Sequence, residues 1–269
     1  MRKGKSTVVT VLIIVFLLVA SAGIFLFRSL KNEDQPTQTP ENDAEGTTKL
    51  QMSGEDKTKR IAEIDAILSD PYMILVNVDN GLTSDYEPED LTTIQDKQLV
   101  KIAAEQLEKM LNAAGEAGLD TINIYSAYRN YSRQETNYNN KVNYYLAEGY
   151  SEDRARELAA EVVNPPGKSE HQTGLATDIC TASIVNNYGN LNEAFEETEE
   201  YEWLYEHCAE YGFVLRYPKD KVEITGITFE PWHYRYVGVE RAKEIMSKKI
   251  CLEEYIQGLK DEKAAIEKE

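Results

Sequence analysis

An uninterrupted apolar run near the start of the chain is the first hydrophobic pattern in the sequence. Residues 6–27, STVVTVLIIVFLLVASAGIFLF, contain no charge and follow three basic residues, Arg2, Lys3 and Lys5. A helix of this length spans a bilayer, and basic residues on the short flank favour a cytoplasmic position for that flank. The pattern therefore predicts a short cytoplasmic tail and a transmembrane signal-anchor over residues 1–31, with the rest of the chain outside the cytoplasm.

A cleaved signal peptide is the alternative for the same segment, because small residues at positions 20–22 resemble a signal-peptidase site. In both cases the following domain is extracytoplasmic. Residues from 31 to about 58 are polar, with almost nothing to pack, which indicates a flexible tether. Isoleucines at 61, 64 and 67 then recur at helical spacing before Pro71. We therefore assign residues 32–70 to a polar linker with a short helix and residues 71–269 to the folded domain.

Within the folded domain, strand-like and helix-like patterns interleave. Helical spacing or capping residues predict helices over residues 99–114, 132–147, 151–163, 193–211 and 239–260. Short runs of branched and aromatic residues predict strands over residues 72–80, 121–126, 212–218 and 224–238. The strands are short and the last ones are separated only by turns. This order predicts an α+β fold with a small, largely antiparallel sheet and helices packed around it.

The composition narrows the classes of partner. The chain has 47 acidic and 29 basic residues and a formal net charge of −18, so nucleic acid and anionic lipid surfaces are excluded as expected partners. Three cysteines, at positions 180, 208 and 251, include no CxxC pair. They predict neither a disulfide framework nor a cysteine-rich zinc site, although one disulfide with one free thiol stays open.

Candidate chemistry centres on two of the three histidines. His171 lies in KSEHQTGLATDI (168–179), seven residues before Asp178, a carboxylate in apolar surroundings that requires a partner. His233 lies in FEPWHYRYVG (229–238). Together the three side chains form a nitrogen and oxygen ligand set for Zn²⁺ that leaves one tetrahedral position for water. His207, in a helical segment without ligand spacing, has a structural interpretation.

Two further residues complete the expected chemistry. Glu230, three residues before His233, is suited to accept a proton from water and pass it to a leaving amine. Arg129 lies between the end of a predicted strand and a helix start, where its guanidinium is suited to clamp a carboxylate or an oxyanion; a plain surface arginine is the alternative. No HExxH helix is present, so these residues must converge from separate segments.

Three ordered motifs carry a family resemblance that extends from about residue 73 to 256. They are SAYR (126–129), S-x-H-x-x-G-x-A-x-D (169–178) and EPWHYRYVG (230–238). Together they resemble the VanY-type zinc D-alanyl-D-alanine carboxypeptidases, a family shared with VanX-like dipeptidases and L,D-carboxypeptidases. The resemblance also implies the α+β fold.

The resemblance implies a role for each matching residue. His171, Asp178 and His233 would hold one zinc ion, with Glu230 as general base and acid and Arg129 stabilising the substrate or the oxyanion. The expected substrate-binding residues are Ser169, Gln134, Tyr128 and Trp232, the last two as pocket walls.

The resemblance implies a zinc metallo-carboxypeptidase that removes the C-terminal D-alanine from peptidoglycan stem pentapeptides. We expect this enzyme to be anchored in a bacterial cell membrane. In a vancomycin setting this reaction removes the target of the drug. The alternatives are an L,D-carboxypeptidase acting on stem tetrapeptides and a zinc-stabilised, non-catalytic cell-wall-binding module. No obligate protein partner is expected.

Overall fold

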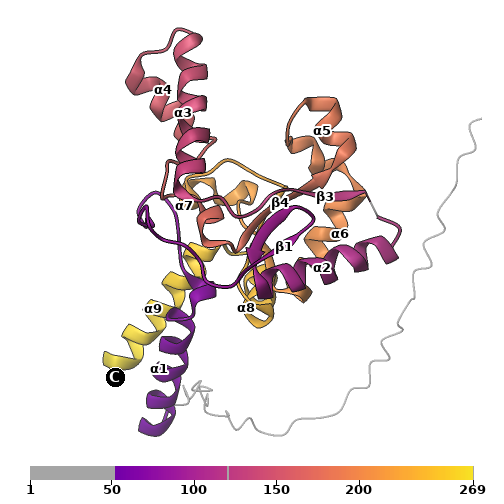
Figure 1. The fold of residues 1–269 in the computed structure, drawn as a ribbon. Helices are drawn as coiled ribbons and strands as arrows, with labels where there is room; N and C mark the ends of the chain where they lie inside the picture. Colours follow the sequence, from indigo (N-terminus) through magenta and orange to yellow (C-terminus); the bar gives the residue numbers. More distant parts are fainter. Residues whose placement is uncertain (1–51, 120, 269) are drawn as a thin grey trace, which may run out of the picture. The chain divides into compact units, whose positions relative to one another are not determined.

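A four-stranded antiparallel sheet lies at the centre of the described chain, residues 52–119 and 121–268 of a computed structural model (Figure 1). The strand order is β3-β4-β6-β5, and every neighbouring pair is antiparallel. The strands are β3 (Ile122–Ser126), β4 (Ala176–Thr181), β6 (His233–Tyr236) and β5 (Phe213–Leu215). Helices pack against this sheet, so the predicted α+β class is confirmed.

A hairpin and a long helix precede the central sheet. Strands β1 (Leu91–Ile94) and β2 (Lys97–Val100) pair through a turn in which Gln95 and Asp96 both adopt positive φ angles. Because this turn contains no glycine, the sequence lacks the usual signal of a two-residue hairpin, and the hairpin was not predicted. Helix α2 (Lys101–Glu116) follows directly and buries its apolar stripe in the main core, as its spacing predicts.

Helices α3 (Tyr131–Ala147) and α4 (Glu152–Ala160) form a hairpin with a small core of its own. The α4 start is as predicted, because Ser151 caps it through its side chain. The α3 start differs from the capping-box prediction. The side chain of Asn130, not Ser132, accepts the cap hydrogen bond from the Arg133 amide, and the helix begins at the next residue.

The single helix predicted over residues 193–211 is wrong in detail, because the segment divides. A 3₁₀ turn (Glu193–Glu197) precedes α6 (Glu199–His207), and a second 3₁₀ turn (Cys208–Tyr211) follows. Thr198 causes the break, since its side chain caps α6 by accepting a hydrogen bond from the Tyr201 amide. Helix α5 (Ala182–Tyr188) lies before this segment.

The C-terminal predictions also need correction. Within the strand predicted over 224–238, only β6 is extended, and a short helix, α7 (Val222–Thr225), overlaps its start after the 3₁₀ turn Lys219–Lys221. The helix predicted over 239–260 is two helices, α8 (Val239–Lys248) and α9 (Leu252–Lys268). They separate at Lys249, which adopts a left-handed conformation with φ 53° and ends α8.

The N-terminal part of the described chain belongs to the folded unit. Helix α1 (Gly54–Leu68) packs against α9, where Arg60 contacts both carboxylate oxygens of Glu262 at 2.6 and 2.9 Å. Residues 54–68 are therefore part of the folded unit rather than of a linker. The strand predicted over 72–80 does not form. Instead a 3₁₀ turn (Pro71–Met73) leads into an irregular segment.

The irregular segment replaces strand pairing with a side-chain contact. Arg235 Nη2 donates hydrogen bonds to the carbonyl oxygens of Tyr72 and Ile74 at 3.0 and 2.8 Å. A buried guanidinium thus satisfies backbone groups that a neighbouring strand otherwise satisfies.

Two further expectations concern membrane and thiols. The predicted transmembrane helix lies outside the described residues, and none of the helices between residues 52 and 268 is both long and apolar enough to cross a bilayer. All three cysteines are buried and free. The alternative of one disulfide is therefore wrong.

Candidate metal centre and catalytic cleft

His171 is held by a tight turn just before the inner strand β4. The 3₁₀ turn Glu170–Thr173 carries it and ends at Gly174, whose φ of 67° and close approach to Leu91 favour glycine. The Nδ1 atom of buried His171 lies 2.6 Å from the carbonyl oxygen of Ala127. Because a carbonyl only accepts, Nδ1 carries the proton, and the lone pair of Nε2 is left free to bind a metal.

Asp178 and His233 face each other across the sheet. They are direct partners in the β4–β6 register. Asp178 Oδ1 lies 2.9 Å from His233 Nδ1, and Asp178 Oδ2 lies 3.2 Å from His171 Nε2. Burial alone raises the pKa of Asp178, but the neighbouring His171 and His233 outweigh it and hold that pKa far below its usual range. The two imidazoles are thus the partners that this buried carboxylate requires.

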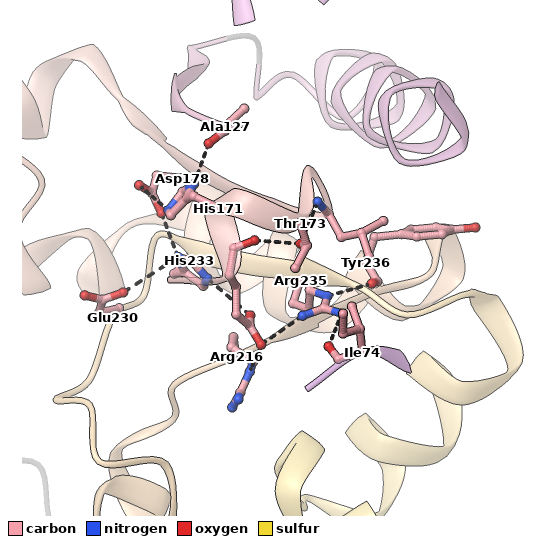
Figure 2. A network of polar contacts seen from close by, with 12 residues as sticks. Ile74, Ala127, His171, Thr173, Asp178, Arg216, Glu230, His233, Arg235 and Tyr236 are labelled. Atoms are coloured by element: carbon pink, nitrogen blue, oxygen red, sulfur yellow. Dashed lines mark hydrogen bonds and ion pairs between the residues drawn. The ribbon is translucent and has the colours of Figure 1, made fainter. Parts of the chain in front are cut away.

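The three side chains bring their ligand atoms to one place. One donor atom each from His171, Asp178 and His233 lies within 4.8 Å of the others, and all three residues are buried (Figure 2). Two imidazole nitrogens and one carboxylate oxygen, with no further ligand from residues 52–119 or 121–268, match the donor set of a catalytic zinc site. The residues therefore fit one zinc ion.

The two histidines differ in charge preference. Burial and the nearby Arg129 lower the pKa of His171 to about 4, so its imidazole is neutral. For His233, burial alone lowers the pKa, but the hydrogen bond with Asp178 and the nearby carboxylates of Glu170 and Glu230 raise it to about 9. The surroundings of His233 therefore favour a positive charge at this point, which a metal cation supplies in exchange for the proton.

Glu230 lies beside the ligand group. Its Oε2 is 3.8 Å from His233 Nδ1, and its backbone carbonyl accepts a hydrogen bond from the His233 amide at 3.2 Å. Burial raises the pKa of Glu230 to about 7, with the negative charge of Asp178 adding to the rise and His233 and Arg129 opposing it. A carboxylate with a pKa near neutrality both takes up and releases protons readily.

Arg129 follows β3 and faces the same centre. Its backbone amide donates to the His171 carbonyl at 3.1 Å. Burial lowers the pKa of the Arg129 guanidinium, while the opposite charges of Asp178 and Glu230 raise it. Its buried Nε has no hydrogen-bond partner within the described chain. The guanidinium is therefore positioned to bind an anionic group that the protein itself does not supply.

A cleft of about 580 Å³ opens above these residues. Ser169 and Trp232 line it, together with Arg129, Glu230 and the three donors. Two of the expected substrate-binding residues do not belong to this described lining. Gln134 is buried below the surface, where its Nε2 donates to the Asn164 carbonyl at 2.6 Å, and Tyr128 lies near Tyr86 and Glu87.

A buried carboxylate, Glu170, was not singled out from the sequence. Its Oε2 lies 3.7 Å from His233 Nε2, and neither atom has a hydrogen-bond partner in the described chain. Its Oε1 accepts from Arg216 Nε at 2.8 Å and lies 2.9 Å from Arg235 Nη1. The two guanidiniums outweigh burial and hold the pKa of Glu170 far below its usual range. An ionised Glu170 favours a proton on His233 Nε2 and so leaves Nδ1 free for a metal.

The ionic layer below His233 is balanced. Arg216 also binds both oxygens of Glu253, in α9, at 2.9 and 2.6 Å. Two carboxylates and two guanidiniums thus neutralise each other among Glu170, Glu253, Arg216 and Arg235, which we call the buried ionic layer. Charged residues inside apolar strand patterns, such as the arginines of FVLRYP and WHYRYV, are the signal that marks such a layer in a sequence.

Comparison with known proteins places the chain in a family. The model of the VanY D-alanyl-D-alanine carboxypeptidases matches residues 96–239, which include the donors, Glu230 and Arg129. The chain belongs to the VanY family. A D-alanyl-D-alanine carboxypeptidase of Enterococcus faecalis (strain ATCC 700802 / V583) is 40% identical over 185 residues, which cover 68% of this chain and 65% of that enzyme.

Solved structures of the VanY family and its neighbours agree in fold. A variant of the vancomycin resistance D,D-pentapeptidase VanY from the VanB-type cassette, solved with Zn(II), has 37% identity and a TM-score of 0.61 and covers 70% of this chain and 99% of its own. The LdcB LD-carboxypeptidase has 39% identity and a TM-score of 0.60, covering 70% of this chain and 88% of its own. The family resemblance inferred from the motifs is thus confirmed, and so is the zinc metallo-carboxypeptidase class.

Proposed function

We propose that this chain is a zinc D-alanyl-D-alanine carboxypeptidase that removes the terminal D-alanine from peptidoglycan stem pentapeptides. One observation carries the proposal: three buried nitrogen and oxygen donors converge beside Glu230 and Arg129 on the floor of a cleft, in a chain of the VanY family. His171, Asp178 and His233 would hold the zinc.

The bound ion supplies Lewis acidity, which polarises a carbonyl and lowers the pKa of water toward neutrality. Glu230 takes the proton of the attacking water and returns it to the departing D-alanine nitrogen, which its pKa near 7 permits. Arg129 holds the negative charge that develops on the peptide oxygen, since its buried Nε has no partner within residues 52–268. Ser169 and Trp232 form the adjoining cleft surface that positions the peptide.

The binding-module alternative is disfavoured by the same geometry. A module that only binds cell wall needs no carboxylate with a pKa near neutrality next to the metal ligands. Glu230 occupies that place and lines the cleft. Its position favours a catalytic role.

The choice of pentapeptide over tetrapeptide rests on the relatives. The Enterococcus relative is a D-alanyl-D-alanine carboxypeptidase, and the VanY structure is that of a D,D-pentapeptidase. LdcB, at similar identity, is an LD-carboxypeptidase. Incubating the purified zinc-loaded chain with synthetic pentapeptide and tetrapeptide stems, followed by mass spectrometry, decides between them. We expect loss of one D-alanine from the pentapeptide and an intact tetrapeptide. Shortening of the tetrapeptide alone overturns the substrate assignment.

We also propose that residues 1–31 anchor the protein in the bacterial cell membrane, with the enzyme domain outside the cytoplasm. The uncharged run at residues 6–27 and its basic flank support this location. Membrane fractionation, followed by protease treatment of intact protoplasts, tests it. The chain should sediment with membranes and lose its domain to external protease; recovery in the cytosolic fraction overturns the proposal.

A further inference from the structure

Helix α3 presents two different faces. Tyr138 and Val142 are buried in the small core shared with α4. Four residues at helical spacing, Asn137, Asn140, Lys141 and Tyr144, line the cleft instead, and we call them the α3 cleft face. Since Tyr144 is 54% exposed, most of its ring is available to a bound molecule. Because α3 begins two residues after Arg129, this face continues along the helix axis away from Arg129.

The charge of the α3 cleft face is unusual for this chain. Lys141 is the single ammonium in the described lining of the cleft, and none of the described carboxylates forms an ion pair with it. Its Nζ lies 5.1 and 5.3 Å from the ring centres of Tyr144 and Tyr145, contacts that hold the ammonium near the wall. In a chain with 47 acidic and 29 basic residues, an unpaired cation in the catalytic cleft calls for an anionic ligand.

The cleft also has a direction. A carboxypeptidase releases one residue, so the leaving side of the substrate ends within one residue of the cut. The α3 cleft face covers two turns, from residue 137 to 144, or about 10 Å at about 1.5 Å per residue. That length matches roughly three residues of extended peptide at about 3.3 Å each. Contacts along this wall therefore fall on the acyl side of the scissile bond, in the part of the stem that stays behind.

We propose that Lys141, with the side-chain amides of Asn137 and Asn140, forms a subsite for a free carboxylate carried by the stem peptide on the acyl side of the cut. The proposal rests on the proposed function, since it assumes a peptide substrate cut near Glu230. A glutamyl residue linked into a peptide through its side chain leaves its α-carboxylate free, and amidation turns that group into a neutral carboxamide. The subsite therefore discriminates between the charged and the amidated forms of one peptide.

The test compares two pentapeptides that are identical except for this carboxylate or carboxamide. Their kcat/KM values are measured with the wild-type chain, Lys141→Gln and Lys141→Arg. Lys109→Gln is the matched control, because Lys109 is exposed on α2, outside the cleft lining, and its loss changes the net charge equally. We expect Lys141→Gln to lower kcat/KM about 3- to 10-fold for the carboxylate peptide and less than about 2-fold for the amidated one.

Lys141→Arg should restore most of the preference for the carboxylate, and Lys109→Gln should leave both values unchanged. Equal losses on both peptides, or no loss on either, overturn the subsite. Failure of the proposed function looks different, because wild type then releases D-alanine from neither peptide. In that case calorimetric affinities of the two peptides for wild type and Lys141→Gln decide: a carboxylate preference that depends on Lys141 supports the subsite, and equal affinities contradict it.

Discussion

The charged side chains on the two sides of the His171-Asp178-His233 group differ in whether the protein itself supplies their ion-pair partners. Below it, the buried ionic layer pairs every charge within the protein, with Glu170 between Arg216 and Arg235. Above it, Arg129 and Lys141 line the cleft, and the described chain gives neither an ion-pair partner within 4 Å. This difference indicates that the charges of the buried ionic layer stabilise the fold and position the metal ligands. Arg129 and Lys141 are instead available to bind an anionic group of the substrate. Substitutions on the two sides should therefore separate stability from catalysis.

The largest effect is expected above the ligand group, at Glu230. Glu230→Gln keeps the shape of the side chain but removes its ability to accept a proton. We expect kcat to fall by about 10²- to 10⁴-fold, with zinc content and the unfolding midpoint nearly unchanged. Glu223→Gln, at an exposed position in α7, is the control. Full hydrolysis by Glu230→Gln contradicts the role assigned to this carboxylate.

A loss of similar size, but in the free energy of unfolding, is expected at Glu170 in the buried ionic layer. Glu170→Ala leaves the two buried guanidiniums of Arg216 and Arg235 without their shared carboxylate. Removing one partner of a buried ionic cluster costs about 3–5 kcal/mol in the free energy of unfolding. Urea unfolding in the presence of a chelator measures this loss independently of the metal.

Glu170→Gln provides the matched comparison. It keeps a hydrogen-bond acceptor for the guanidiniums and should destabilise less than Glu170→Ala. We also expect it to weaken zinc binding by about 10-fold or more, because His233 loses its charged neighbour. Chelator competition measures that affinity. A stability and zinc affinity equal to those of wild type show that the buried ionic layer does not position His233.

The third largest effect is a loss of activity expected at Arg129, on the cleft side of the metal ligands. Arg129→Met removes the guanidinium from the cleft without leaving a buried partner charge unpaired. We expect a loss of about 10²- to 10³-fold in kcat, the size found when one oxyanion donor is removed. Zinc content should be retained. If KM alone rises, Arg129 binds the ground-state substrate and the assigned role in charge stabilisation is wrong.

The smallest effect is expected for an exposed ion pair that belongs neither to the buried ionic layer nor to the cleft. Lys248 and Glu244 form an exposed ion pair on α8 at 2.6 Å, and neither belongs to the described lining of the cleft. Lys248→Ala should change the free energy of unfolding by about 0.5 kcal/mol or less. Thermal unfolding of this variant sets the background against which the buried ionic layer is judged. A loss comparable to that of Glu170→Ala would remove the contrast between buried and exposed charges.

The sequence predicted the grouping of His171, Asp178 and His233, which the structure shows side by side, better than the boundaries of the elements. His171 and Asp178 share one short motif, and an aspartate in apolar surroundings signals a partner by its cost of burial. Its pairing with His233 depends on the β4–β6 register across 55 positions; the residue types predicted one ligand set, but not this register.

The failures have local causes. Tyr72 and Ile74 are apolar and strand-like, but a distant arginine satisfies their carbonyls, so no strand forms. Thr198 and Lys249 interrupt helices whose apolar spacing continues through them, the first by capping and the second through a left-handed backbone.

The metal itself gives the most direct test of the central claim. We expect elemental analysis of the purified chain to give about one zinc per molecule, and a crystal diffracted at the zinc edge to give one anomalous peak in contact with His171 Nε2, His233 Nδ1 and the Asp178 carboxylate. An anomalous peak away from these atoms, or a chain free of metal that still releases D-alanine from the pentapeptide, contradicts the account.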